Sequence, residues 1–301
     1  RTGTLYIGYA KGDNAMAIIV NTNMSSLKTQ NNLNNATNAL NTALERMSTG
    51  SKINSAKDDA AGLYVATNLS KQISGSKIAQ SNVETGNNVL STVEGNLDVI
   101  LDNLNRIRDL TVQASNGVYD ADSQKAMSDE VAARMDEITR ISNSANFNGL
   151  NLLNGSITND LRLQVGSDAD PLANCIHVSK DVFACMSANG ALALGTTDAV
   201  AATFKDPSAA AEYLETVDAA INVINTNKST IGAIQNRLDA AASSLTTTIE
   251  NATAAKSTIM DADIAAESAE YTKQQILRQT SATLLVQANA MPSLALNLIA
   301  G

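Results

Sequence analysis

The sequence predicts a mainly α-helical protein, a long antiparallel coiled-coil or helical bundle with a small β-hairpin region. Apolar residues recur in alternating steps of four and three over several long stretches, the period of helices that pack in a coiled coil. Aromatic residues make up only 3% of the chain and Trp is absent, so small aliphatic side chains must fill the core, as they do in narrow helix–helix seams. Only three Pro interrupt 301 residues, which leaves room for long helices.

The clearest seam lies in the C-terminal third of the chain and has two polar members, Lys228 and Gln235. Gly232 lies inside this stretch, but it costs only about 1 kcal/mol relative to Ala, too little to break so long a helix. The seam consists of Val217, Ile221, Ile224, Lys228, Ile231, Gln235, Leu238, Ala242, Leu245, Ile249 and Ala252. An upstream seam with the same period consists of Val93, Leu97, Ile100, Leu104, Ile107, Thr111 and Ala114.

Two further helices are expected in the same bundle, at about 59–95 and 122–143. One face of the second helix carries Met127, Val131, Arg134 or Met135, Ile138 and Ile141. A single helix cannot bury such a stripe, so these segments must pack together. The short connection over 115–121 favours antiparallel neighbours.

Two outer helices have a different composition. The seam of the first is Leu33, Ala36, Leu40, Ala43 and Met47, and Gly50 ends that helix. The seam of the second is Leu277, Ser281, Leu284, Ala288 and Met291, and Pro292 ends it. The other faces carry Asn, Gln, Ser and Thr instead of Lys–Glu pairs, so few ion pairs support these helices. We expect both to be marginal alone and to become ordered when a partner covers them.

The middle of the chain, about 144–208, is predicted to hold turns and short strands. NFNGLNLLNGS contains Asn-Gly twice between aliphatic residues, and LRLQVG alternates as a strand does. Residues 167–208 are weakly patterned and form an insert between two halves of one bundle. At the N-terminus, we interpret residues 1–15 as upstream translated sequence or a cloning remnant. The alternative is a short extension in which LYIGY forms a strand.

The charge and motif content argue against several classes of function. A net charge of −9 disfavours a binder of phosphate backbones. His177 with Asp181 makes no metal site, and the acids of 261–267 suit the first turn of a helix better than a cation. No catalytic motif is present, so we expect no enzyme activity, cofactor or metal.

Two further features bear on where the protein works. Cys175 and Cys185 are either free thiols or, if the chain leaves the cell, one disulfide. No stretch approaches the ~20 apolar residues that span a membrane, and no ordinary secretory signal is visible. The protein is therefore either cytoplasmic or exported by a route that does not read such a signal.

The stretch NRIRDLTVQASN, residues 105–116, places Arg106, Leu110 and Gln113 together on a face outside the upstream seam. Asp102 and Asp109 lie close enough along the helix to hold the Arg106 guanidinium by charge. An aliphatic residue flanked by Arg and Gln suits a contact patch. The alternative is a solvated face with one stray Leu.

Several motifs, in order along the chain, resemble bacterial flagellin, the filament subunit, with a short variable region. They are IVNTNMSSLKTQNNLN (19–34), LERMSTGSKINSAKDDAAGL (44–63), LNRIRDLTVQASNG (104–117), NFNGLNLLNG (146–155), LQVG (163–166), GAIQNRLDAA (232–241) and IMDADIAAESAEYTKQQILRQTSATLLVQAN (259–289). The two cysteines, the 1–15 extension and the end NLIAG depart from the family pattern.

The resemblance implies an inner domain of paired terminal helices, a core bundle with a β-hairpin, and an outward insert. The expected segments are 1–16 (upstream extension or remnant), 17–58 and 257–301 (inner helical domain), 59–155 and 209–256 (core bundle domain), and 156–208 (short variable insert with β-strands). It also implies a secreted, extracellular structural protein that polymerises with itself and is exported unfolded by the flagellar type III system. A hook–filament junction protein, which shares the terminal helices, is the alternative.

The resemblance further implies partners and contact residues. Carried over by position, Arg106, Leu110, Gln113, Glu130 and Arg134 match subunit contacts that family members also present to the flagellin-sensing Toll-like receptor of the host. The C-terminal helix is expected to serve inner-domain assembly and an export chaperone through Leu277, Leu284, Leu285, Ala288 and Met291. Hook-associated and cap proteins are further expected partners; nucleic acid and membrane insertion are not.

Overall fold

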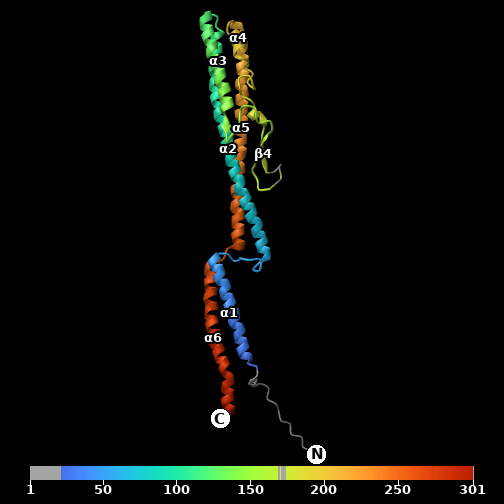
Figure 1. The fold of residues 1–301 in the computed structure, drawn as a ribbon, viewed down its shortest axis with the longest axis vertical. Helices are drawn as coiled ribbons and strands as arrows, with labels where there is room; N and C mark the ends of the chain where they lie inside the picture. Colours follow the sequence, from blue (N-terminus) through green and yellow to red (C-terminus); the bar gives the residue numbers. More distant parts are fainter. Residues whose placement is uncertain (1–21, 169, 171–173, 301) are drawn as a thin grey trace, which may run out of the picture. The chain divides into compact units, whose positions relative to one another are not determined.

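The computed structural model of the chain describes residues 22–168, 170 and 174–300, with backbone alone over 292–300. The expectations for residues 1–16 fall outside the described residues. The helices are α1 (Met24–Thr49), α2 (Ala60–Ala114), α3 (Ala121–Ser144), α4 (Thr197–Thr203), α5 (Pro207–Met260) and α6 (Ile264–Ala300), with a 3-10 turn η1 (Lys180–Phe183). The strands are β1 (Asn146–Phe147), β2 (Leu150–Asn151), β3 (Leu161–Gln164) and β4 (Cys175–Val178) (Figure 1). The predicted mainly α fold class is confirmed.

The chain divides into two compact units, residues 1–66 with 256–301 and residues 67–255. The boundaries fall inside α2 and α5, so each long helix contributes to both units. The assignment of the chain segments to an inner and a core domain stays a prediction.

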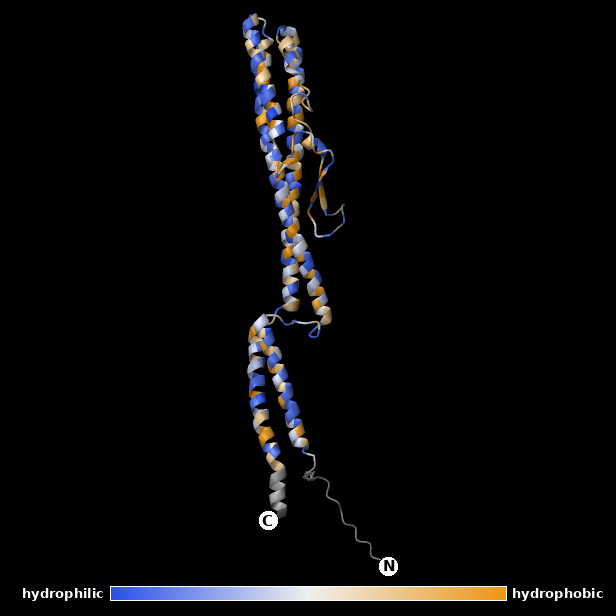
Figure 2. Cartoon of the chain, in the orientation of Figure 1, coloured by the Kyte–Doolittle hydropathy of each residue, from blue (hydrophilic) through white to orange (hydrophobic). Residues whose placement is uncertain are grey.

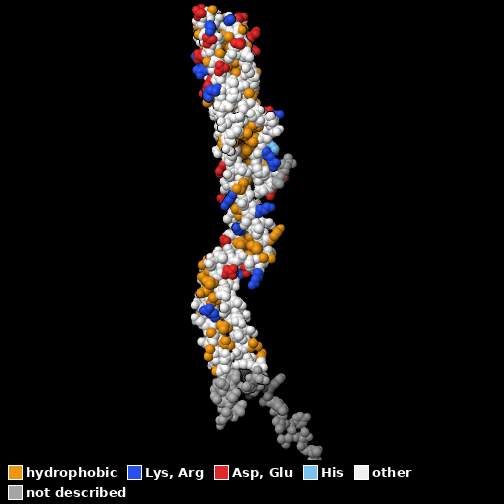
Figure 3. Space-filling model, in the orientation of Figure 1, with side chains coloured by type: hydrophobic (Ala, Val, Ile, Leu, Met, Phe, Trp, Pro, Cys, Tyr) orange, Lys and Arg blue, Asp and Glu red, His pale blue; other side chains and the backbone are white. Residues whose placement is uncertain are grey.

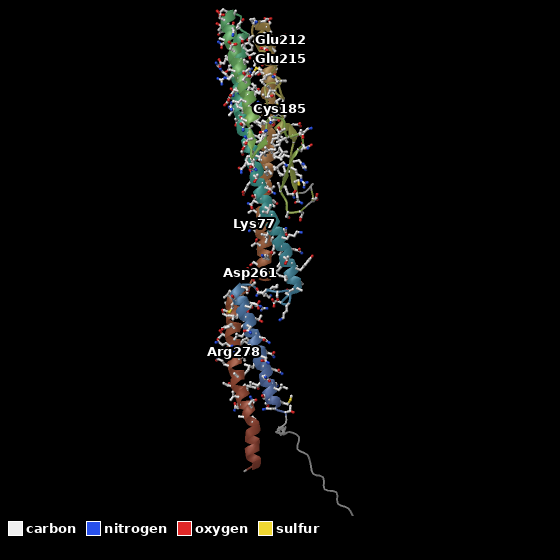
Figure 4. All side chains as sticks on the ribbon, in the orientation of Figure 1. Lys77, Cys185, Glu212, Glu215, Asp261 and Arg278 are labelled. Atoms are coloured by element: carbon white, nitrogen blue, oxygen red, sulfur yellow. The ribbon has the colours of Figure 1, made fainter. Side chains whose placement is uncertain are left out.

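In the first unit α1 and α6 pack antiparallel, and the seam predicted for α1 is confirmed. Ala36, Leu40 and Ala43 are buried there, and Gly50 ends α1 in the left-handed conformation at φ 68°. Between the helices, Arg46 Nη1 lies 3.2 Å from Glu267 Oε1. Beyond them, Asp261 forms an isolated antiparallel bridge with Ser51 (Figure 4).

The seam predicted for α6 is wrong in part. Ser281 and Ala288 are buried as expected, but Leu277, Leu284 and Met291 are exposed. The half-buried positions that continue the period of Ser281 and Ala288 are Glu267, Tyr271, Gln274, Arg278 and Leu285. Mostly small and polar side chains, with Tyr271 and Leu285, therefore face α1, whereas Leu277, Leu284 and Met291 face outward.

Pro292 does not end α6, contrary to expectation, because the helix continues to Ala300. A proline inside a helix removes the N–H that would donate to the carbonyl four residues earlier. That carbonyl, on Ala288, instead accepts a hydrogen bond from Asn23 Nδ2 at 2.7 Å. A side chain from the N-cap of α1 thus replaces the missing donor.

In the second unit both long seams are confirmed. Along α2 every residue from Val93 to Ala114 that was assigned to the seam is fully buried, and on α5 the buried members alternate with half-buried ones. The helix expected at about 59–95 is not separate, because α2 runs unbroken from Ala60 to Ala114. On α3 the buried choice is Met135 rather than Arg134. Figure 2 shows apolar residues recurring along these helices.

The Asn-Gly turn and the LRLQVG strand are also confirmed. Asn148 and Gly149, both at positive φ (49° and 82°), join β1 to β2, as a two-residue hairpin turn requires. Strand β3 pairs antiparallel with β4, Leu161 opposite Val178.

The weakly patterned insert is better packed than its sequence suggests. Phe183 and Phe204 are completely buried and belong to the same hydrophobic cluster as α2, α3 and α5. Tyr213 of α5 meets the ring of Phe204 edge-on and donates its hydroxyl hydrogen bond to the Leu194 carbonyl at 2.9 Å. Burial raises the pKa of Tyr213 to about 12.

Candidate functional site

The predicted contact patch on α2 and α3 is centred on a bidentate ion pair. Arg106 Nε donates to Glu130 Oε1 at 2.8 Å, and Nη2 donates to Oε2 at 3.1 Å. This fork raises the pKa of the Arg106 guanidinium and lowers that of the Glu130 carboxyl. The expectation that Asp102 and Asp109 hold Arg106 by charge is met in part: the paired carboxylate comes from α3, and Asp109 adds a weaker charge interaction.

Arg134 extends the same polar group. Its Nη2 lies 3.9 Å from Glu130 Oε1, and its Nη1 donates to Asn103 Oδ1 at 3.2 Å. Gln113 is exposed but bonds elsewhere, since its Nε2 donates to the Tyr119 hydroxyl at 2.9 Å. The structure therefore joins Arg106, Glu130 and Arg134 in one ionic cluster and holds Gln113 beside the turn that follows α2.

Leu110 does not lie on the outward face, and the prediction that it does is wrong. Its exposed fraction is only 3%, within the hydrophobic cluster. Helix α2 packs against both α3 and α5, so its buried arc is wider than one heptad seam. Periodicity against a single partner could not show this second contact.

A second candidate surface is the outward face of α6. Leu277, Leu284 and Met291, seven residues apart, are 43%, 50% and 51% exposed, and Ile276 and Val286 are exposed beside them. Figure 3 shows apolar side chains at the surface of this unit. Of the other two residues expected to serve assembly, Leu285 is half-buried and Ala288 is buried. Within the described residues, the aliphatic stripe therefore has no partner that covers it.

Cys175 and Cys185 are free thiols in the structure, which agrees with the first alternative and not with the disulfide. Cys175 Sγ accepts from Arg162 Nε and donates to Gln164 Oε1, both at 2.9 Å. Cys185 lies in the segment after η1 (Figure 4), where its Sγ is 3.2 Å from Ser187 Oγ. Each sulfur thus has its own polar neighbour.

The remaining residues considered for a metal or catalytic site are His177 and the acids of 261–267. His177 is exposed on β4. Asp263 caps α6, its Oδ1 accepting from the N–H groups of Ala265 (2.9 Å) and Ala266 (3.2 Å). Within the described part of the chain no group of three His, Cys, Asp or Glu could hold a metal. None of the described helices has both the length and the apolarity to cross a membrane.

Sequence reasoning missed three functional neighbours: Tyr119, Asn103 and Asn23. The first two position Gln113 and Arg134, and nothing in the heptad pattern marks them. Asn23 does carry a signal, because an Asn directly before a helical period is a typical N-cap. Its Oδ1 accepts from the Ser26 N–H at 3.0 Å.

Comparisons with known proteins bear on both surfaces. Residues 20–158 match the family model described as the bacterial flagellin N-terminal helical region, and residues 214–299 match the bacterial flagellin C-terminal helical region. The outward stripe of α6 lies inside the second match, and the α2–α3 patch lies inside the first.

Curated relatives match nearly the whole chain. It is 35% identical to the flagellar filament 30.7 kDa core protein of Treponema maltophilum, over 90% of this chain and 96% of that one. It is 36% identical to flagellin of Bacillus subtilis strain 168, over 93% of this chain and 99% of that one. A solved structure of a putative flagellar hook-associated protein from Vibrio parahaemolyticus is similar in fold, with a TM-score of 0.57, 18% identity, and coverage of 67% of this chain and 99% of that one.

Proposed function

The chain belongs to the bacterial flagellin family, and from that premise we propose that it polymerises with copies of itself into the filament of a bacterial flagellum. It would act there as an extracellular structural subunit for motility, without enzyme activity. The relatives that match it over most of their length are named as flagellins and filament core proteins.

The observation that carries this proposal is the aliphatic stripe on α6. Large apolar side chains that gather uncovered on one face of a monomer mark association sites. Leu277, Leu284 and Met291 repeat at the heptad period, so the stripe suits a second helical partner rather than a small ligand. Exposed Leu27 and Leu44 add apolar surface on α1 of the same unit.

Seeded polymerisation tests the proposal. Leu277→Ser with Leu284→Ser should leave the monomer helical and abolish sedimentable filament growth, because the seam residues that face α1 are unchanged. The matched control is Thr280→Ser with Gln287→Ser, two exposed polar positions on the same helix. Wild-type growth by the double Leu variant, with and without residues 1–15, would count against a role in assembly.

We also propose that the chain is exported unfolded and is held before export by a chaperone on α6. The exposed members of the stripe are accessible in the paired helices, but Ala288 is buried against α1. A chaperone contact that includes Ala288 and Leu285 therefore requires α6 to leave α1. Chaperone binding should consequently expose the amides of α1 to hydrogen exchange; an unchanged exchange rate in α1 would oppose this order of events.

The polar patch is proposed as a contact for neighbouring subunits and for the flagellin-sensing receptor of the host. The side chains of the patch that are accessible in the single chain are Arg106, Gln113, Glu130 and Arg134. Leu110 is buried on the same helix as Arg106 and Gln113. Arg106→Ala should weaken both receptor signalling and filament packing. Leu110→Ala should lower stability as well, by about 2–5 kcal/mol, because it removes buried methyl groups. Full signalling by folded Arg106→Ala would remove the receptor from this proposal.

The junction alternative receives less support. The similarity to the hook-associated protein is 18% in sequence and concerns the fold alone. Relatives that are more than a third identical over nearly all of their length are filament proteins. A gene deletion separates the two roles: loss of a junction protein leaves secreted, unattached filament subunits, whereas loss of the filament subunit leaves none.

A further inference from the structure

Several polar contacts join α2 to α5 along the second unit, and we call four of them the register pairs. They are Arg108 Nε with Asp218 Oδ1 (2.6 Å), Lys228 Nζ with Asp98 Oδ1, Gln235 Nε2 with Ser91 Oγ (3.5 Å), and Asn87 Nδ2 with Asp239 Oδ1 (3.0 Å). The first two pairs are ionic, the Gln235–Ser91 pair is neutral, and the Asn87–Asp239 pair joins an amide to a carboxylate. All four lie in or beside the apolar seam. A further contact runs from Gln235 Nε2 to Glu94 Oε2 at 3.4 Å.

The register pairs have the same spacing on both helices. Along α5 they occupy positions 218, 228, 235 and 239, and along α2, read in the opposite direction, positions 108, 98, 91 and 87. The intervals are therefore equal on the two helices. All four contacts are compatible with one antiparallel alignment.

The apolar seam cannot select this alignment alone. Both seams repeat every seven residues, so sliding one helix by a heptad, about 10.5 Å along the axis, again places aliphatic residues opposite aliphatic residues. The long intervening chain, which includes α3 and the insert, does not tie neighbouring residues of α2 and α5 together as a short turn does. Sequence chemistry beside the seam must discriminate between these alignments.

A heptad slip in either direction breaks the register pairs. In one direction Asp239 comes level with Glu94, so two acids face each other, and Lys228 loses its acidic partner. In the other direction Asp98 comes level with the aliphatic Ile221, and Asp218 with Leu101. In several coiled coils a polar position at the helix–helix seam specifies register at a cost in stability.

We propose that the register pairs are the specificity determinants that fix the alignment of α2 against α5, and hence the length over which the two helices overlap in the second unit. This inference goes beyond the proposed function and does not depend on it, since it concerns the fold of a single chain.

The test measures the alignment directly in the full chain. Nitroxide labels at Thr85→Cys and Thr226→Cys, both exposed and on different helices, report the offset of α2 and α5 in a Cys175→Ser, Cys185→Ser background. Pulsed electron paramagnetic resonance should give one distance for the native pairs. Neutralising the ionic pairs with Arg108→Gln, Asp218→Asn, Lys228→Gln and Asp98→Asn should add a second distance, changed by up to about 10 Å.

The matched control is Lys77→Gln, Glu84→Gln, Arg237→Gln and Glu250→Gln, which removes the same charges from exposed positions of the same helices. It should keep one distance. A single native distance in the neutralised variant, or the same second distance in the control, would overturn the proposal.

A second comparison covers the case in which the neutralised variant does not fold. Lys228→Asp alone places an acid against Asp98 and should produce the second distance, whereas Asp98→Lys with Lys228→Asp restores the pair in reverse and should return to one. Equal distance distributions for these two variants would equally refute the role of the register pairs.

Discussion

At the scale of single residues, Asn23 does two jobs that the sequence shows only in part. Its side-chain oxygen caps α1 at Ser26, and its amide nitrogen donates to the Ala288 carbonyl that Pro292 leaves without a helical donor. One side chain therefore satisfies one backbone group in each of the two helices.

Asn23→Ala should destabilise the α1–α6 unit by about 1 kcal/mol for the lost cap and by a further 1–3 kcal/mol, roughly, for the orphaned carbonyl. Asn23→Asp keeps the capping oxygen and loses only the donor. In a Pro292→Ala background the helix supplies its own N–H, so only the capping loss should remain. Hydrogen exchange of α1 and α6 amides measures these losses. Equal penalties with and without the Pro292→Ala substitution would disprove the coupling.

The Glu130 carboxyl should make the stability of the folded chain depend on pH. Arg106 lowers the folded-state pKa of this carboxyl below the ordinary value of 4.5. A lowered folded pKa adds stability that is present above the unfolded pKa and is lost as the pH falls through the folded pKa. The wild-type protein should therefore have a higher melting temperature than Glu130→Gln at pH 7. This difference in melting temperature should vanish when the pH falls below the folded-state pKa of Glu130. Thermal melts across pH measure this, and Glu84→Gln, at an exposed carboxylate of α2, is the control; a difference that does not change with pH would contradict the prediction.

At the scale of elements, the sequence predicts the helices whose hydrophobic residues repeat with a regular period and misses the packing of segments without such a period. The α2, α3 and α5 seams follow from hydrophobic period alone, and so does the α1 seam. On α6 two overlapping stripes compete, and hydrophobicity favours Leu277 and Leu284 although the small side chains of Ser281 and Ala288 allow the closer approach to α1. Leu110 is missed for a related reason, because a helix with two partners buries more than one stripe. The packed insert, built on Phe183 and Phe204, has no period to reveal it.

The glycines of α2 and α5 give an element-scale prediction. A Cβ at Gly232 would meet nothing within 4 Å, whereas one at Gly86 would lie 2.7 Å from Leu163 Cδ1. Gly232→Ala should therefore stabilise the second unit by about 0.4–1 kcal/mol, since it only restricts the unfolded chain. Gly86→Ala should stabilise less or destabilise, because the Leu163 side chain must move. Urea titrations compare the two, and a larger gain at Gly86 would oppose the packing argument.

At the scale of the whole molecule, the two units are held by unequal cores. The second unit buries a continuous aliphatic cluster that includes both Phe183 and Phe204. The first unit buries few large side chains, Leu40 and Ile53 among them, and leaves Leu277, Leu284 and Met291 exposed. Stability follows buried apolar area, so the first unit should open far more often in the single chain.

Hydrogen exchange on the full chain checks this inequality in two states. In monomers the amides of α1 and α6 should exchange at least about tenfold faster than those of α2 and α5 between Val93 and Leu238, because opening free energies span the range from frayed ends to the global value. In filaments the exposed Leu284 face would be covered by neighbours, so α1 and α6 should slow toward the rates of the second unit. Protease digestion within 22–50 and 264–291 should follow the same order. Rates in α1 and α6 that do not differ between monomer and filament would show that these helices are already stable alone and do not order on assembly.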